Sequence, residues 1–191
     1  MSRKPRILSP YTYYHVFNRG IARKSIFTSN YHYNLFLELL EITSETYNIE
    51  IHAYCLMKNH FHLLLLDINS NLSKAMQSML SKFSRKINKD INSDGAVFKD
   101  RFKSIIVDSN RYLSHLSRYI HLNPVEAGMV SSPENYHWSS CKYYLNDHCP
   151  KFLEKDKILN CFMSQNEYQE FLNLGIDKNT KAILSSNLNT L

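Results

Sequence analysis

The chain has 191 residues, 43% of them hydrophobic and 21% charged, which allows one domain with a buried core, or one domain with an appendage. Its 23 Lys and Arg against 17 Asp and Glu give a formal net charge of +6, which mildly favours a polyanionic partner. With no run of transmembrane length, no signal-peptide pattern and no C-x-x-C pair among its Cys, the sequence predicts a cytoplasmic protein with reduced thiols.

The first third of the chain predicts three strands and one helix. Aromatic and β-branched residues gather in short runs that are typical of strands, at residues 13–18, 49–56 and 60–66. Between the first two, Ser29 and Asn30 can cap a helix that runs to about Tyr47, because apolar residues recur there at helical spacing. A short turn at residues 57–59 joins the second and third strands.

The middle of the chain predicts a helix, a strand and a further helix. Residues 71–88 are amphipathic at helical spacing. Residues 97–107 predict a fourth strand that charged residues interrupt. Residues 108–110 then supply a cap for a helix at about 111–122, which Pro124 is expected to end.

This order of elements predicts an α+β protein with a ferredoxin-like, split βαβ sandwich. In such a fold an antiparallel sheet carries helices on one face, and its open face can lie against nucleic acid. The pattern weakens after about Pro133, although residues 164–174 look helical and the polar stretch 179–191 is expected to fray. We therefore predict a domain at 1–133 and a partly helical C-terminal extension at 134–191, which can act as a DNA clamp or pack on the sheet.

His60 and His62 are the most informative residues. On a strand, alternate side chains share a face, so the two imidazoles point the same way while Phe61 between them points into the core. Two nitrogen ligands on a rigid strand can hold one metal ion. Such an ion can bind and polarise a phosphodiester.

The helix before Pro124 supplies a nucleophile for that phosphodiester. Tyr119 and Asn123 are four residues apart and therefore stack on one helix face. A phenol is a poor nucleophile at its ordinary pKa near 10, but a nearby cation favours the phenolate. The amide oxygen of Asn123 can be a third ligand, in a site that suits Mg²⁺ or Mn²⁺. Attack by Tyr119 would give a covalent phosphotyrosine and a free 3′ hydroxyl.

These motifs resemble those of the HUH endonucleases. The similarity is greater to the single-tyrosine transposases of the insertion-sequence-200-like superfamily, and the Leu-Asn-Pro-Val element at 122–125 resembles the branch called REP-associated tyrosine transposases. The resemblance covers about residues 11–130, and the stretches that carry it are 14–20, 53–62, 98–104 and 118–125.

The resemblance implies a metal-dependent nuclease and strand transferase that acts on single-stranded DNA near hairpins. In the family the two histidines bind metal, which implies this role for His60 and His62. The family's tyrosine is the nucleophile, which corresponds to Tyr119. The polar residue one turn later completes the metal site, which corresponds to Asn123. Glu126 departs from the pattern, because the related branch often has Arg there, and a carboxylate would repel phosphate. Insertion-sequence relatives are dimers and the REP-associated branch resembles a monomer, so we expect a monomer and keep a homodimer as the alternative.

Basic residues form clusters that can neutralise the phosphates of a DNA backbone. The candidates follow the first strand, line the second helix, and alternate on the fourth strand, where they would share one face: Arg19, Arg23 and Lys24; Lys82, Arg85, Lys86 and Lys89; Lys99, Arg101 and Lys103.

Other interpretations stay open on the sequence alone. The protein can be a catalytically silent nucleic-acid-binding module of the same fold, or a metal-dependent phosphodiesterase that uses water in place of Tyr119. His121 is either structural or faces DNA, and His15 and His52 are either core residues or supports of the ligands. The histidine and lysine sets can also be packed or solvated side chains, and a zinc site fits no common spacing of the candidates Cys141, Cys149, Cys161 and His148.

Overall fold

A computed structural model describes residues 8–108 and 110–176. The strands are β1 (Thr12–Arg19), β2 (Ile49–Met57), β3 (His60–Asp67) and β4 (Lys103–Val107). The α-helices are α1 (Asn30–Tyr47), α2 (Leu72–Asp90), α3 (Asn110–Glu126), α4 (Cys141–Tyr144), α5 (Asp156–Leu159) and α6 (Gln165–Asn173), with short 3-10 turns η1 (Ile21–Arg23) and η2 (Pro133–Asn135). In these ranges, no helix combines the length and the apolar character that crossing a membrane requires.

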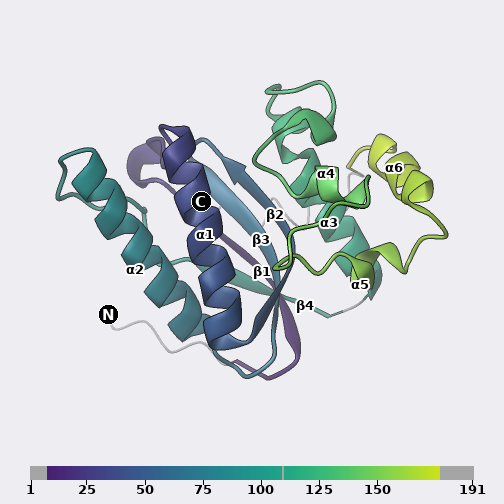
Figure 1. Ribbon diagram of the computed structural model, residues 1–191, viewed down its shortest axis with the longest axis horizontal. Helices are drawn as coiled ribbons and strands as arrows, with labels where there is room; N and C mark the ends of the chain where they lie inside the picture. Colours follow the sequence, from purple (N-terminus) through teal and green to yellow (C-terminus); the bar gives the residue numbers. More distant parts are fainter. Residues whose placement is uncertain (1–7, 109, 177–191) are drawn as a thin grey trace.

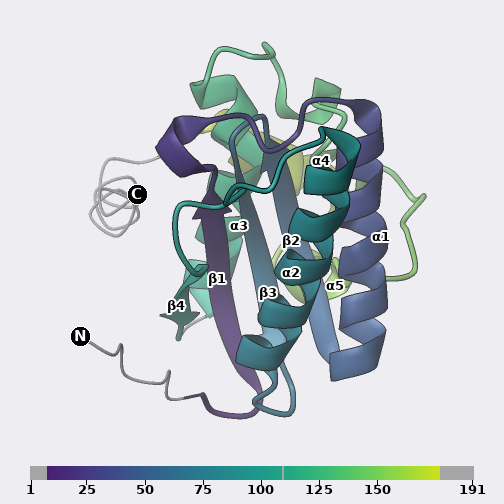
Figure 2. The same ribbon diagram turned by 90° about the vertical axis from the view of Figure 1, so that its left-hand side faces the viewer.

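The strands form one antiparallel sheet in the order β2-β3-β1-β4 (Figure 2). With α1 between β1 and β2 and α2 between β3 and β4, this is the predicted ferredoxin-like α+β arrangement. In the register, His62 lies opposite Phe17 of β1 and Cys55 of β2, which puts β3 inside the sheet. Strand β3 is therefore paired on both edges along its whole length.

One face of the sheet packs against α1 and α2, as Figure 1 shows. The alternate residues Phe61, Leu63 and Leu65 of β3 are buried there against helix residues such as Phe36 and Phe83. The predicted helices of the split βαβ unit therefore do lie on one face.

The opposite face is covered as well, and the expectation of an open face is wrong. Leu64 of β3 and Cys55 of β2 pack there against Leu116 and Ile120 of α3 and against Tyr168 of α6. The extension runs along the edge of β2, which it meets through isolated bridges; its helix α6 packs on the α3 side of the sheet, whereas Trp138 and Leu153 pack into the core on the α1 side (Figure 1). Residues 179–191, which we expected to fray, lie outside the described residues.

Two predicted boundaries differ from the structure. β4 begins at Lys103, because the preceding segment 97–102 makes only an isolated bridge, between Phe98 and Gly20 just after β1, and turns Phe102 into the core on the α2 side. Helix α3 continues to Glu126 with Pro124 inside it, and the backbone N–H of residue 127 still donates to Asn123 O at 3.0 Å. The expected cap of α3 includes position 109, which lies outside the described residues.

Candidate active site

Strand β3 presents His60 and His62 on the α3 side of the sheet, as the alternation predicts. Their ring centroids lie 5.2 Å apart. Across the sheet, His60 pairs with Arg19 of β1 and Met57 of β2, so the Arg19 side chain lies on the same face. Since β3 is central, a regular ladder on both sides fixes the spacing of the two imidazoles.

Each histidine of this pair already uses one ring nitrogen. His62 Nδ1 lies 3.0 Å from Nε2 of the buried His15, and His60 Nδ1 lies 2.7 Å from Oδ1 of Asn59. The Nδ1 contacts leave Nε2 of both rings as the nitrogens that can bind a ligand. When His62 carries its proton on Nδ1, it donates to His15, whose own Nδ1–H is then the buried atom without a partner.

All three imidazoles are neutral at pH 7. Burial lowers the pKa of His60, and burial together with the neighbouring His15 and His60 lowers that of His62 well below its ordinary value. Burial lowers the pKa of His15 to about 3. A neutral imidazole is the form that binds a metal ion.

Helix α3 brings Tyr119 and Asn123 to this pair. The Tyr119 ring centroid lies 5.6 Å from that of His62, and the rings meet edge to face. Asn123 Nδ2 donates to Tyr119 O at 3.0 Å. Burial raises the pKa of the Tyr119 hydroxyl to about 12, while a hydrogen bond from the Asn123 side chain lowers that pKa and another with His60 raises the pKa of the imidazole. The amide of Asn123 therefore links nucleophile and histidine.

These side chains line one pocket of about 230 Å³, called here the histidine pocket. Its lining residues are Arg19, Arg23, Asn59, His60, His62, Tyr119 and Asn123. The Nε of Arg19 is buried without a partner, in a pocket that offers it no carboxylate. Such a donor suits an anionic ligand.

The loop after β1 sets the place of Arg23. Gly20 N donates to Asn59 O at 2.8 Å, and Ile26 N to Lys58 O at 2.9 Å, so the loop is tied to the turn between β2 and β3. A Cβ on Gly20 would run into the Lys24 carbonyl, and Arg23 itself has a positive φ of 59°. The requirement for glycine here therefore serves the histidine pocket.

The donor set fits a hard divalent cation that keeps open positions. Two neutral imidazole nitrogens and the Asn123 amide oxygen are the available ligands, and phosphate oxygens and water can complete such a site. In the described part of the chain, no three His, Cys, Asp or Glu side chains gather as a metal site. This also removes support from the zinc alternative, since Cys141 is buried and Cys161 exposed, both as free thiols.

The other side of α3 carries a second group of polar side chains, which the sequence did not predict. His121 Nδ1 lies 2.8 Å from Tyr168 Oη, and His121 Nε2 lies 2.7 Å from Ser140 Oγ. Ser117 Oγ also contacts Tyr168 Oη at 3.1 Å. We call these four residues the His121 network. It fastens α3 to the C-terminal extension, so His121 is structural and does not face DNA.

The predicted DNA-binding residues do not form one surface. Arg19 and Arg23 lie in the histidine pocket, while Arg85 and Arg101 line a separate hollow beside α2. Of the remaining candidates, Lys82 lines a hollow that adjoins this one. These candidates are all exposed except the half-buried Lys103: Lys24, Lys82, Lys86, Lys89, Lys99 and Lys103. The prediction that three of them share one face of a strand is wrong, because β4 starts only at its last member.

Comparison with known proteins gives one family and a shared fold. The family model described as "Transposase IS200 like" matches residues 9–123. The solved structure of a REP-associated tyrosine transposase bound to a REP hairpin is similar with a TM-score of 0.65 and 17% identity, over 82% of this chain and 93% of that one. A presumed transposase from Deinococcus radiodurans R1 has a TM-score of 0.42 and 17% identity, over 62% and 95% of the two chains. None of the curated proteins matches.

Proposed function

Because this chain belongs to the family of IS200-like transposases, we propose that it cuts and rejoins single-stranded DNA beside hairpins through a covalent bond to Tyr119. The observation that carries the proposal is the histidine pocket, in which Tyr119 and Asn123 of α3 meet His60 and His62 of β3. The similar REP-associated transposase was solved with a hairpin, which supports the choice of substrate.

The arginines of the histidine pocket hold the phosphate to be cut. The unpartnered Nε of Arg19 donates to one phosphate oxygen, and Arg23 enters from the tied loop. Both side chains are planar cations whose shape matches phosphate oxygens. They therefore bind the DNA backbone whatever its sequence, which leaves recognition of the cleavage sequence to other residues.

His60, His62 and Asn123 are proposed to hold Mg²⁺ or Mn²⁺, which when bound supplies Lewis-acid polarisation of the phosphate. The support is the neutral state of both imidazoles and their two Nδ1 contacts, which direct Nε2 to a ligand. Binding needs no proton release from the histidines, because they are already neutral at pH 7.

Tyr119 carries the chemistry. Its Oη forms a bond to phosphorus while the bond from phosphorus to the 3′ oxygen breaks, and the phenol proton ends on that oxygen as a 3′ hydroxyl. The 5′ phosphate stays on Tyr119 as a phosphotyrosine, whose bond energy is kept. A second 3′ hydroxyl then attacks phosphorus, joins the strands and returns the proton to Tyr119, so no ATP is consumed. Asn123 steadies the phenolate by its hydrogen bond.

The site needs no second subunit in this proposal. Both sides of the histidine pocket come from one chain, β3 from one side and α3 from the other, which supports a monomer. We assign catalysis to residues 1–133 and the holding of α3 to the extension at 134–191, through Ser140 and Tyr168.

The test incubates labelled hairpin oligonucleotides that carry single-stranded flanks with the protein and Mg²⁺ or Mn²⁺. We expect a protein–DNA species that survives denaturing electrophoresis, and its loss with EDTA or in Tyr119→Phe. The matched control is Tyr112→Phe on the same helix, which should keep the species.

The alternatives give different patterns. A phosphodiesterase that uses water would keep cutting in Tyr119→Phe, and a silent binding module would cut nothing before mutation. Either pattern, across a broad panel of hairpins, would refute the proposed function.

A further inference from the structure

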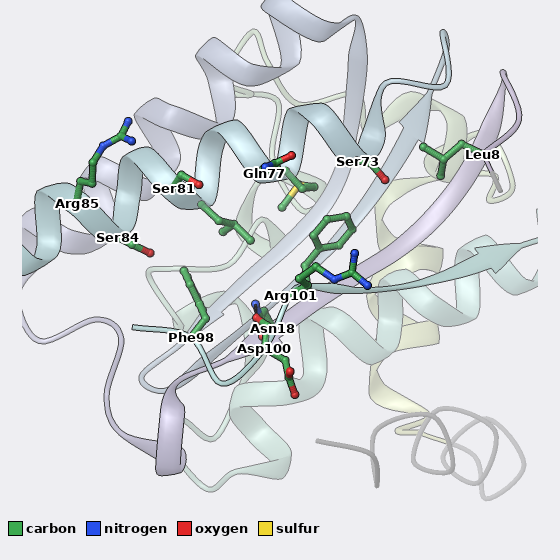
Figure 3. Close-up of a pocket in the computed structure, with 13 residues that line it drawn as sticks. Leu8, Asn18, Ser73, Gln77, Ser81, Ser84, Arg85, Phe98, Asp100 and Arg101 are labelled. Atoms are coloured by element: carbon green, nitrogen blue, oxygen red, sulfur yellow. Dashed lines mark hydrogen bonds between the residues drawn. The ribbon is translucent and has the colours of Figure 1, made fainter. Parts of the chain in front are cut away.

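A second and larger hollow lies behind the histidine pocket, on the opposite face of β1. Its volume is about 740 Å³, and it lies between α2 and the segment 98–102 that precedes β4 (Figure 3). Asn18 lines this hollow and the next residue, Arg19, lines the histidine pocket. Successive strand residues point to opposite faces, so both cavities adjoin the same end of β1. We call the second cavity the α2 hollow.

The base of the α2 hollow is apolar and includes an aromatic ring. Met76, Leu80 and Phe102 are buried there, whereas Phe98 is half-buried. Two buried core rings hold Phe98, with centroids at 6.1 Å from both Phe61 and Phe83. A fixed and partly exposed ring beside a roomy cavity can take the flat face of a nucleobase.

The rim of the α2 hollow is polar and carries charges of both signs. Arg85 of α2 and Arg101 of the facing segment supply guanidiniums, and Gln77 and Ser81 supply an amide and a hydroxyl (Figure 3). Asp100 is the carboxylate at this rim. Guanidiniums suit a phosphate, and a carboxylate accepts from the exocyclic amino group of adenine, cytosine or guanine.

The basic rim continues along α2. A neighbouring hollow of about 440 Å³ shares Gln77, Ser81 and Arg85 with the first and adds Lys74 and Lys82. A strand that leaves the α2 hollow therefore meets further cations at the spacing of a helix face. Helix α2 is itself fixed, because Asp67 at the end of β3 accepts its first backbone N–H groups at 2.8 Å.

We propose that the α2 hollow holds one unpaired nucleotide of the DNA, with its base against Phe98 and its phosphate at Arg101, while Arg85, further along α2, is placed for a neighbouring phosphate. This inference rests on the proposed function for the identity of the ligand, but it does not depend on cutting. An apolar base, an aromatic ring and a charged rim together fit a nucleotide better than an apolar peptide or a free anion. The α2 hollow would then bind DNA on the face of β1 that is opposite to Tyr119.

The test measures binding without cleavage, by fluorescence anisotropy in the Tyr119→Phe protein with EDTA. The probe is a labelled DNA hairpin with single-stranded flanks, in which each flank nucleotide in turn is replaced by an abasic residue. We expect one position at which the abasic residue weakens binding about tenfold, the scale of one stacked base. Phe98→Ala should weaken binding of intact DNA by a similar factor. In this variant the abasic residue at that position should have no further effect, because the ring and the base are the two partners of the same contact.

Companion variants separate stacking from folding. Phe98→Leu keeps an apolar side chain without the ring and should also lose the position-specific effect. Arg101→Ala should weaken every DNA and lower the slope of log affinity against log salt by about one. The control Lys151→Ala removes an exposed charge on the extension and should change neither.

The outcomes of the two tests are independent. Additive losses at every position, or tighter binding of the RNA version of the hairpin, would overturn the nucleotide site even if the covalent species forms. A position-specific loss that depends on Phe98, without any covalent species, would support the nucleotide site and refute the proposed catalysis.

Discussion

The histidines that lie on the two sides of helix α3 differ in how many of their ring nitrogens are hydrogen-bonded within the protein. On one side, His60 and His62 use Nδ1 within the protein and line a pocket that opens to solvent. On the other side, both ring nitrogens of His121 are engaged, by Tyr168 and Ser140, and the ring is fully buried. A histidine with one free ring nitrogen can bind a ligand and so take part in catalysis. A histidine with both ring nitrogens in hydrogen bonds can only stabilise the fold.

The largest effect should come from the pocket side. In His60→Ala with His62→Ala, we expect cleavage to fall about a thousandfold or more, since the phosphate loses several kcal/mol of polarisation in the transition state. The melting temperature should also fall, mainly through the buried His62, whose loss leaves a cavity and removes the partner of His15, whereas His60 borders solvent; cleavage is therefore measured at a temperature at which the variant is folded. Single-turnover cleavage and thermal melting check the two halves of this prediction.

On the side of the His121 network, His121→Ala should lower the free energy of unfolding and leave the chemistry largely unchanged. It removes two buried hydrogen bonds, to Tyr168 Oη and Ser140 Oγ, and leaves a cavity in place of a buried ring, which costs about 2–4 kcal/mol of unfolding free energy. Urea denaturation measures that loss, and cleavage at low temperature, where the variant is still folded, should stay within a few-fold of wild type. If His121→Ala were as stable as wild type but inactive, the division between the two sides of α3 would be wrong.

The contact between His15 and His62 links a buried core residue to a proposed metal ligand. His15→Phe removes the acceptor that fixes the His62 proton on Nδ1, and we expect Mn²⁺ affinity to fall about 10–100-fold. His15→Gln keeps an acceptor and should recover part of the affinity. Titration followed by the Mn²⁺ resonance spectrum measures both, without any need for cleavage.

Acid should destabilise the protein through its buried neutral histidines. Burial lowers the pKa of His121 and of His15 to about 3, so the unfolded chain, with an ordinary pKa of 6.5, binds more protons between these values. Stability is therefore present above pH 6.5 and falls as the pH drops, by up to about 1.4 kcal/mol per pH unit for each group. Urea unfolding at pH 7 and pH 5 should show a smaller drop for His121→Gln than for wild type.

The smallest effect concerns Glu126, at the end of α3. Its charge raises the pKa of the Tyr119 hydroxyl further, after the larger effect of burial, and it repels phosphate. Glu126→Gln should speed formation of the covalent species a few-fold at low salt, and less at high salt because the carboxylate is exposed. Glu170→Gln on α6 removes an equally exposed charge and should have no effect.

The sequence predicts the sheet and the pairing of its functional residues well. Alternation fixes the common face of His60 and His62, and the four-residue spacing fixes the common face of Tyr119 and Asn123, because both follow from backbone geometry alone. The expected strands lie within about two residues of β1, β2 and β3. That the two pairs meet depends on the packing of α3 on the sheet, and only the resemblance to a family predicted it.

Other features could not be read from the sequence. Phe98 and Phe102 alternate with charged residues as in a strand, but both rings turn to the core beside α2, and this packing outweighs pairing with β1. The His121 network joins residues far apart in the chain and leaves no periodic signal. Pro124 predicts the end of a helix locally, yet the helical turn continues after it.

The order in which the chain is made gives the His121 network a further consequence. The ribosome completes β3 and α3 before it adds Ser140 and Tyr168, the residues that hold α3 against the sheet. We expect a growing chain to carry Tyr119 on a loosely placed helix until this late segment emerges. Synthesis itself would then delay the proposed DNA cutting until the segment that carries Tyr168 has left the ribosome.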